Sequence, residues 1–118
     1  MATPICVVSG AQYLSRGGWV DLRNNSNTEP PFRLFRDEGR TYLQWLGESD
    51  MRLAMEGRLI LVHLMCKDAN GAEQHKIFTP CVAFRVAGNP SKTFSIFIYL
   101  VPGFITFLEK NLCLIFSA

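Results

Sequence analysis

The stretch of sequence that decides the fold is 58–86, which reads RLILVHLMCKDANGAEQHKIFTPCVAFRV. Two runs rich in β-branched, aliphatic and aromatic residues, 58–67 and 73–86, are typical of strands. They flank Asn70-Gly71, the dipeptide preferred in two-residue type I′ hairpin turns. This stretch therefore predicts a β-hairpin, the firmest element that the sequence indicates.

The register of this hairpin follows from its turn. With Asn70-Gly71 as the turn, Cys66 lies opposite His75. One face is then expected to be buried, and it continues through Ile60, Val62 and Leu64 opposite Ile77, Thr79 and Cys81. The other face is expected to be partly exposed, because it carries polar side chains near the turn, namely His63, Lys67, Gln74 and Lys76.

A second hairpin is expected upstream. The runs 32–36 and 41–46 flank Asp37-Glu38-Gly39-Arg40, a connection with glycine where a turn needs positive φ. Pro30-Pro31 favours extended backbone just before the first run. The sequence therefore predicts two strands joined by a four-residue turn.

Shorter elements are expected around these hairpins. Residues 5–8 and 19–22 read as short strands, separated by Gly10 and by a turn or bulge at Gly17-Gly18. Ser49 is a candidate N-cap for a short helix over 50–56, and a glycine follows that helix. We therefore expect at most one short helix among strands.

The C-terminal segment 93–118 is unusually apolar. Its first part, 93–108, carries no charge and is hydrophobic on both alternating faces, so strands formed there need cover on both sides. Pro102-Gly103 suits a turn within it, and a further strand is expected at 112–116. A membrane helix is the alternative, although the uncharged part is shorter than a typical span of about 17–25 residues. Uncovered, the segment would offer an aromatic association surface of Phe94, Phe97, Tyr99, Phe104 and Phe107.

Length and composition bound the fold class. The chain has 118 residues, 48% hydrophobic and 19% charged, which suits a single β-rich domain over 1–118. With the strand patterns above, we expect a mainly β fold, either a small antiparallel barrel or a sandwich. The net charge of +2 is too small to predict a nucleic-acid partner.

The cysteines do not indicate a metal site or a redox pair. Cys6, Cys66, Cys81 and Cys113 include no Cys-x-x-Cys, and the histidines do not converge on them in the expected hairpin. A Cys66–His75 pair lacks the orienting acid and the oxyanion-stabilising groups of a nucleophilic enzyme. We expect free buried thiols, no metal, no cofactor and no catalysis. The N-terminus does not resemble a signal peptide, which predicts a cytoplasmic location, with peripheral membrane contact as an alternative.

Arginine and aromatic residues interleave through the second hairpin. The set is Phe32, Arg33, Phe35, Arg36, Arg40, Tyr42 and Trp45. Guanidinium groups beside stacking rings suit ligands that carry phosphate. The alternative is an ordinary strand pair with core aromatics and solvated arginines, because Arg33 and Phe35 share one face and Phe32 and Leu34 the other.

Within this stretch, Pro31–Trp45 (PFRLFRDEGRTYLQW) resembles the early strands of pleckstrin-homology domains of the phospholipase C type. The shared pattern is a Pro-x-x-Leu-like strand, an acidic glycine turn and a Leu-x-Trp strand. The resemblance implies a seven-stranded antiparallel barrel closed by a C-terminal helix, which binds phosphoinositides or protein partners through loops. It also implies Arg16, Arg23 and Arg33 as head-group ligands. The closing helix has no counterpart in the apolar segment 93–118.

Two functions are therefore expected. The first is a non-catalytic binding module that recognises a phosphate-bearing ligand or an acidic protein surface through Arg16, Arg23, Arg33, Arg36 and Arg40. The alternative is an interaction or assembly protein that uses 93–118 for oligomerisation or membrane association. The expected partner is another protein or a second copy of the chain, and a phosphoinositide or a membrane surface is a further candidate.

Overall fold

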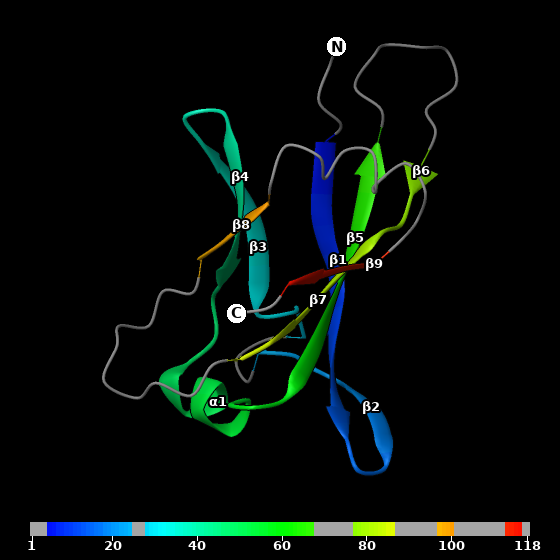
Figure 1. Ribbon diagram of the computed structural model, residues 1–118, viewed down its shortest axis with the longest axis vertical. Coiled ribbons are helices and arrows are strands. Elements are labelled where there is room, and N and C mark those ends of the chain that lie inside the picture. Colours follow the sequence, from blue (N-terminus) through cyan, green and yellow to red (C-terminus); the bar gives the residue numbers. More distant parts are fainter. Residues whose placement is uncertain (1–4, 25–27, 68–76, 87–96, 101–112, 117–118) are drawn as a thin grey trace.

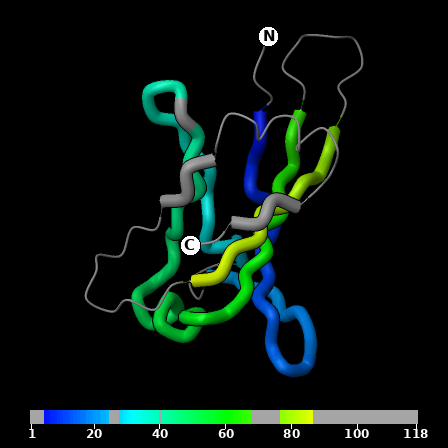
Figure 2. Tube along the Cα trace, viewed as in Figure 1, coloured from blue at the N-terminus to red at the C-terminus, as the bar shows by residue number. Residues whose placement is uncertain are grey.

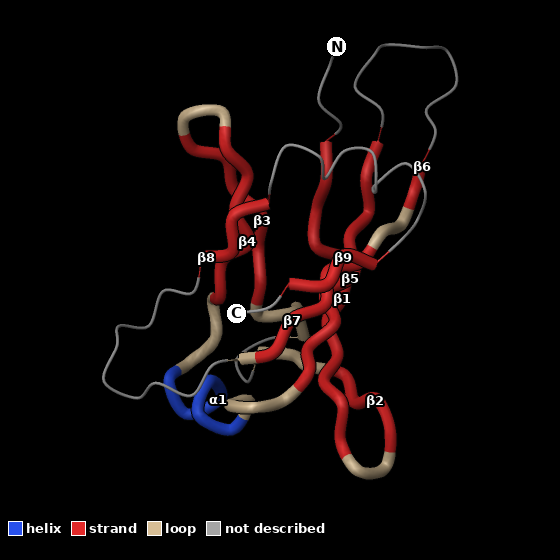
Figure 3. Tube along the Cα trace, in the orientation of Figure 1, coloured by secondary structure: helices blue, strands red, loops and turns tan. Residues whose placement is uncertain are grey.

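The computed structural model describes residues 5–24, 28–67, 77–86, 97–100 and 113–116. Most of these residues lie in strands, joined by short turns and one short helix (Figures 1 and 3). Figure 2 traces the same chain path by residue number. The elements are β1 (Ile5–Ser15), β2 (Gly18–Asp21), β3 (Phe32–Asp37), β4 (Arg40–Trp45), α1 (Ser49–Ala54), β5 (Leu59–Lys67), β6 (Ile77–Phe78), β7 (Cys81–Arg85), β8 (Phe97–Leu100) and β9 (Cys113–Phe116).

The described strands form two sheets. The larger has the order β2-β1-β5-β7-β9, with β6 also paired to β5, and the smaller has the order β3-β4-β8. The pairing of β7 with β9 is parallel, and the other described pairings are antiparallel. Figure 1 shows the smaller sheet on one side of the molecule, the larger sheet on the other and α1 at one end. The expected mainly β fold with one short helix is confirmed, as a sandwich-like arrangement that does not close into a barrel.

The hydrophobic core lies between the two sheets. On β5, every second side chain is fully buried, from Ile60 through Val62 and Leu64 to Cys66. The smaller sheet contributes Phe32, whose ring makes edge contacts with Trp45 at 5.2 Å and with Phe84 of β7 at 5.8 Å between centroids. Such aromatic contacts add to the burial of the rings, and here they join the two sheets.

The hairpin of β3 and β4 is the element that the sequence predicted best. Asp37 pairs with Arg40, so the turn consists of Glu38 and Gly39 alone. Both have positive φ, 51° and 76°, as a type I′ turn requires. The expected hairpin is therefore confirmed, but its turn has two residues instead of four.

The register of β5 with β6 and β7 differs from the expectation. Cys66 pairs with Phe78 and His63 with Cys81, whereas the sequence predicted His75 opposite Cys66. The predicted buried face of β5 is confirmed, but its partners are wrong. The actual register is displaced by three residues from the one expected for Cys66, and an odd displacement reverses the face that each partner residue presents. Residues 68–76, which include the proposed turn and His75, lie outside the described part of the chain.

The expectation of free thiols is also wrong. Cys6 and Cys66 are register partners on β1 and β5, and they form a disulfide across 60 residues of sequence. Cys81 is disulfide-bonded as well, and its backbone pairs in register with that of Cys113 on β9. The pairing of β1 with β5 sets the first bond, and spacing along the chain does not reveal it.

Other elements differ only in detail. β1 continues through Gly10, because a bulge between Val8 and Gly10 takes up the irregularity, so the strand break expected there is wrong. Helix α1 is present as expected, but Glu48 is its N-cap residue and no side chain caps it. The strand expected at 112–116 is confirmed as β9, whereas Pro102-Gly103 lies outside the described residues.

Candidate functional site

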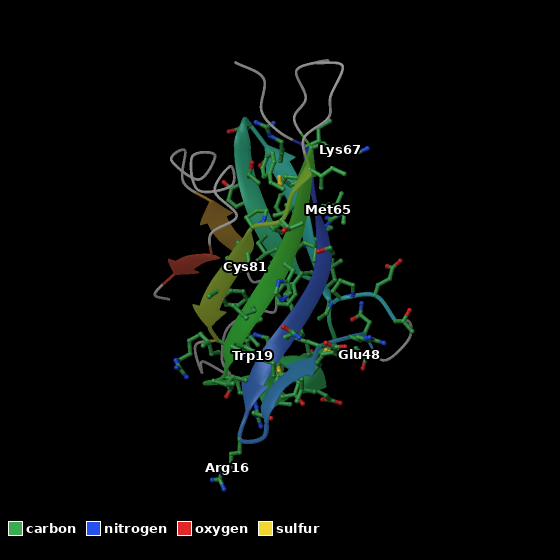
Figure 4. The ribbon with its side chains drawn as sticks, turned by 90° about the vertical axis from the view of Figure 1, so that its right-hand side faces the viewer. Arg16, Trp19, Glu48, Met65, Lys67 and Cys81 are labelled. Atoms are coloured by element: carbon green, nitrogen blue, oxygen red, sulfur yellow. A yellow bond between two sulfur atoms is a disulfide. The ribbon has the colours of Figure 1, made fainter. Side chains whose placement is uncertain are left out.

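The structure does not bring the five predicted arginines to one site. Arg16 lies at the tip of the β1–β2 turn and extends away from the molecule (Figure 4). Arg23 lies just after β2 and lines a pocket together with residues of β1. Arg33 and Arg36 both lie on β3, but side chains three residues apart on a strand point to opposite faces. Arg40 opens β4 opposite Asp37.

The predicted aromatic surface is described only in part. Phe97 and Tyr99 lie on β8, where they pair in register with Gln44 and Tyr42 of β4. Phe94, Phe104 and Phe107 lie outside the described residues. The described portion of this surface is therefore a strand of the smaller sheet.

One arginine lies in an organised setting on the outer side of the smaller sheet. Phe32, Leu43 and Trp45 point into the core, so the residues between them on β3 and β4 point outward. These outward residues are Arg33, Phe35, Tyr42 and Gln44, and we call them the Arg33 face.

Two contacts hold the Arg33 side chain in place, and a third supports the ring beneath it. Its Nε donates to Oε1 of Gln44, the register partner of Arg33, at 2.6 Å. Its guanidinium lies over the Phe35 ring, 5.6 Å from the centroid, within the range of a cation–π contact. Phe35 in turn stacks on Tyr42, with centroids 5.2 Å apart and an interplanar angle of 19°. The β3–β4 register therefore creates an exposed arginine that lies over the Phe35 ring, which in turn stacks on Tyr42.

The charge of Arg33 is not matched by a carboxylate within the described part of the chain. Its contacts there are an amide oxygen and a ring, and the Gln44 bond engages only Nε. A guanidinium presents its remaining N–H groups as a planar fork that fits carboxylate or phosphate. Within the described residues, this geometry leaves the rest of the fork without an anionic partner.

A second site, which the sequence did not reveal, is a pocket beside the bulge of β1. Its volume is about 420 Å³, and its polar lining comes from Ser9, Gln12, Asp21, Arg23, Thr28 and His63. The segment after β2 runs along β1, where the N–H of Leu22 donates to the carbonyl of Ala11 at 2.9 Å. We call this feature the β1 pocket.

A chain of hydrogen bonds crosses the β1 pocket. The Nε2 of His63 lies 3.1 Å from Oε1 of Gln12, and Nε2 of Gln12 donates to Oδ1 of Asp21 at 3.4 Å. Arg23 donates to the other oxygen, Oδ2, at 3.0 Å. Among the predicted arginines, only Arg23 lines this pocket. The sequence analysis did not identify the other residues of this pocket. The signal that could have found them is that Gln12 and His63 are polar residues within mostly apolar strands.

The chemistry of these groups does not form a recognisable catalytic arrangement. Ser9 donates its hydroxyl to the backbone carbonyl of His63, 3.2 Å away, and not to the imidazole. Cys66, once considered beside His75 as a nucleophile, is held in a disulfide. No cluster of metal-ligating side chains occurs among the described residues. None of the helices in the described ranges has the length and apolar character needed to cross a bilayer.

Comparison with protein-family models, with curated proteins and with solved structures finds no match to this chain.

Proposed function

We propose that this protein is a non-catalytic binding module that recognises phosphate or carboxylate groups of a partner through the Arg33 face. The observation that carries the proposal is the support of Arg33. Its guanidinium is held by Gln44 and lies over Phe35, and no described carboxylate neutralises it. A side chain that is already oriented loses less conformational entropy on binding.

The surroundings of Arg33 suit a partner with both anionic and apolar parts. Phe35 and Tyr42 place a stacked ring pair beside the guanidinium. Aromatic residues and arginine are the side chains most enriched at the energetic centres of protein interfaces. A phosphate-bearing ligand and an acidic protein surface both carry oxyanions. We therefore propose that the Arg33 face recognises an oxyanion that lies beside an apolar group.

The experiment compares two arginines on one strand. Arg33→Gln removes the charge from the Arg33 face, and Arg36→Gln removes the same charge from the opposite face of β3. The probes are inositol hexakisphosphate, poly-L-glutamate and vesicles that contain phosphatidylinositol bisphosphate, titrated into the full chain at two salt concentrations. We expect Arg33→Gln to weaken binding about tenfold, in line with the loss of one charge-assisted hydrogen bond, and Arg36→Gln to have little effect.

Arg33→Lys separates the charge from the planar fork. It keeps the cation but loses the bidentate geometry, so an intermediate affinity is expected. Equal losses for Arg33→Gln and Arg36→Gln would indicate a diffuse charge effect and contradict the proposal, as would the absence of binding to all three probes.

The assembly alternative is favoured by a different surface from the one that the sequence suggested. The described parts of 93–118 are strands of the two sheets, β8 and β9. Exposed apolar side chains gather instead on adjoining strands β1, β5 and β6, where Ile5 is 65% and Ile77 57% exposed. Light scattering of the full chain with and without Ile77→Lys tests whether this surface joins two copies.

We retain a cytoplasmic location as a proposal, although the disulfides argue against it. Disulfides persist in oxidising compartments and are rare in the cytosol. Counting free thiols on protein taken directly from cells under alkylation would decide the matter. A reduced Cys6–Cys66 pair is expected in the cytosol, and an intact bond would contradict that location.

A further inference from the structure

We propose that the β1 pocket is a second binding site, separate from the Arg33 face, and that it takes a neutral, hydroxyl-rich ligand such as a sugar or a cyclic polyol. Its volume of about 420 Å³ falls within the usual range of about 300–1,000 Å³ for small-molecule pockets. The inference rests on the pairing of the charges inside the pocket and on the orientation of its polar groups.

The charges of the pocket compensate each other. Arg23 and Asp21 are joined at 3.0 Å, and each keeps more than half of its side chain exposed. An anionic ligand would have to take Arg23 from Asp21, and a cationic ligand would have to take Asp21 from Arg23. A neutral ligand leaves the Arg23–Asp21 pair intact and can still form hydrogen bonds with the polar atoms of the pair that face the pocket.

The hydrogen-bond chain fixes the orientation of the neighbouring groups. The Asp21 carboxylate only accepts, so it must meet the amide nitrogen of Gln12. This turns Oε1 of Gln12 toward His63, and because that oxygen also only accepts, Nε2 of His63 must carry a hydrogen. In the neutral imidazole, Nδ1 is then the acceptor. The pocket wall therefore has a defined pattern of donors and acceptors before any ligand arrives.

The pattern contains donors and acceptors together. The second N–H of Gln12 and the remaining N–H groups of Arg23 donate, the hydroxyl of Thr28 donates and accepts, and the hydroxyl of Ser9, whose hydrogen goes to the His63 carbonyl, accepts. A hydroxyl group of a ligand also does both, so a polyol satisfies such a wall more completely than a phosphate, which mainly accepts. A ligand that covers these polar groups without pairing with them would bind more weakly.

The test compares a neutral and an anionic probe that share the same carbon ring. The neutral probe is myo-inositol, accompanied by D-glucose and D-galactose, and the anionic probe is inositol hexakisphosphate. Each is titrated into the isotope-labelled full chain, and the backbone amide signals of Gly10, Gln12 and His63 are followed by NMR. We expect at least one neutral probe to shift these signals with a Kd on the order of 1 mM, and the anionic probe to shift signals of the Arg33 face instead.

Gly10→Val adds a side chain to the wall of the pocket at a position where the strand has room for it. A Cβ at Gly10 meets no atom within 4 Å, and the backbone there is not in the left-handed region. A β-branched residue also suits a strand. We expect the Kd for the neutral probe to rise at least tenfold in this variant, while Arg33→Gln leaves it unchanged. The pocket can thus fail while the Arg33 face succeeds, and the reverse.

Asp21→Asn tests the charge argument directly. It leaves Arg23 without its carboxylate, so inositol hexakisphosphate should now shift the Gly10 and Gln12 signals. Three results would overturn the proposal. They are no shift with any neutral probe up to its solubility limit, shifts that persist in a folded Gly10→Val variant, and binding of the anionic probe to the β1 pocket of the unaltered protein.

Discussion

Arg23 in the β1 pocket and Arg33 on the outer side of the smaller sheet are the same residue type in opposite electrostatic situations. Arg23 has a carboxylate partner 3.0 Å away, whereas Arg33 is held by an amide oxygen at 2.6 Å and by an aromatic ring. The first surface is polar and compensated, and the second keeps an unmatched charge within the described structure. A count of arginines does not predict which surface attracts an anion, because the strand register supplies or withholds the counter-charge.

The largest expected effect concerns the β1 side alone. Replacing both Cys6 and Cys66 by Ser removes a link across 60 residues and should lower the free energy of unfolding by about 4 kcal/mol by loop entropy. Urea denaturation followed by circular dichroism measures the change. In molecules that remain folded, probe binding at the Arg33 face should persist. A loss below about 1 kcal/mol would mean that strand pairing alone holds β1 to β5.

The next effect concerns the inner support of the Arg33 face. A Cβ on Gly47 would overlap with Cζ2 of the Trp45 ring, so Gly47→Ala must displace that buried ring. Overpacking of this kind costs about 1–3 kcal/mol. Thermal unfolding and tryptophan fluorescence report the change. Gly10→Ala is the matched control, since its Cβ meets nothing within 4 Å, and a comparable loss in both variants would contradict this account.

A smaller effect is expected at the turn that aligns β3 with β4. Gly39 has φ +76°, where an alanine is strained, so Gly39→Ala should lower the free energy of unfolding by about 1 kcal/mol. Because this turn sets the pairing of Arg33 with Gln44, affinity for an anionic probe should fall as well. Urea denaturation and probe titration measure the two quantities. An unchanged stability would argue against the type I′ turn.

The smallest effect is predicted for the compensated arginine. Arg23→Gln removes an exposed ion pair, and such pairs contribute about 0–1 kcal/mol, so unfolding should shift by less than 1 kcal/mol. Binding of inositol hexakisphosphate, followed by calorimetry, should stay as it is. A loss as large as that of Arg33→Gln would erase the distinction between the two surfaces.

Much of the fold was predictable where the signal is local. Glycine and its acidic neighbours identified the β3–β4 hairpin, and alternation along β5 identified its buried face, because both depend on residues close together in sequence. Asn70-Gly71 carries an equally strong local signal, yet the observed register pairs Cys66 with Phe78. The pairing of β5 with β6 and β7 involves residues distant from this dipeptide, which itself lies outside the described part of the chain.

The sequence identified some of the residues at the candidate sites, but it did not predict which residues would lie next to them in the structure. Arg33 and Phe35 were singled out, but the role of Gln44 depends on the pairing of β3 with β4. In the β1 pocket, Gln12 and His63 are 51 residues apart and meet only because the bulge in β1 shifts the register with β5. No pattern within a single strand encodes such a meeting.

The placement of β8 and β9 affects how the protein folds during its synthesis. In the smaller sheet β8 pairs with β4, and in the larger sheet β9 pairs with β7, so a strand that comes later in the sequence completes each sheet. Because β8 and β9 are synthesised after β4 and β7, the edges of β4 and β7 remain open until then and can pair with other chains. Contacts so distant in sequence also slow folding. Until β8 and β9 have paired, the nascent chain is therefore open to edge-to-edge association with other chains.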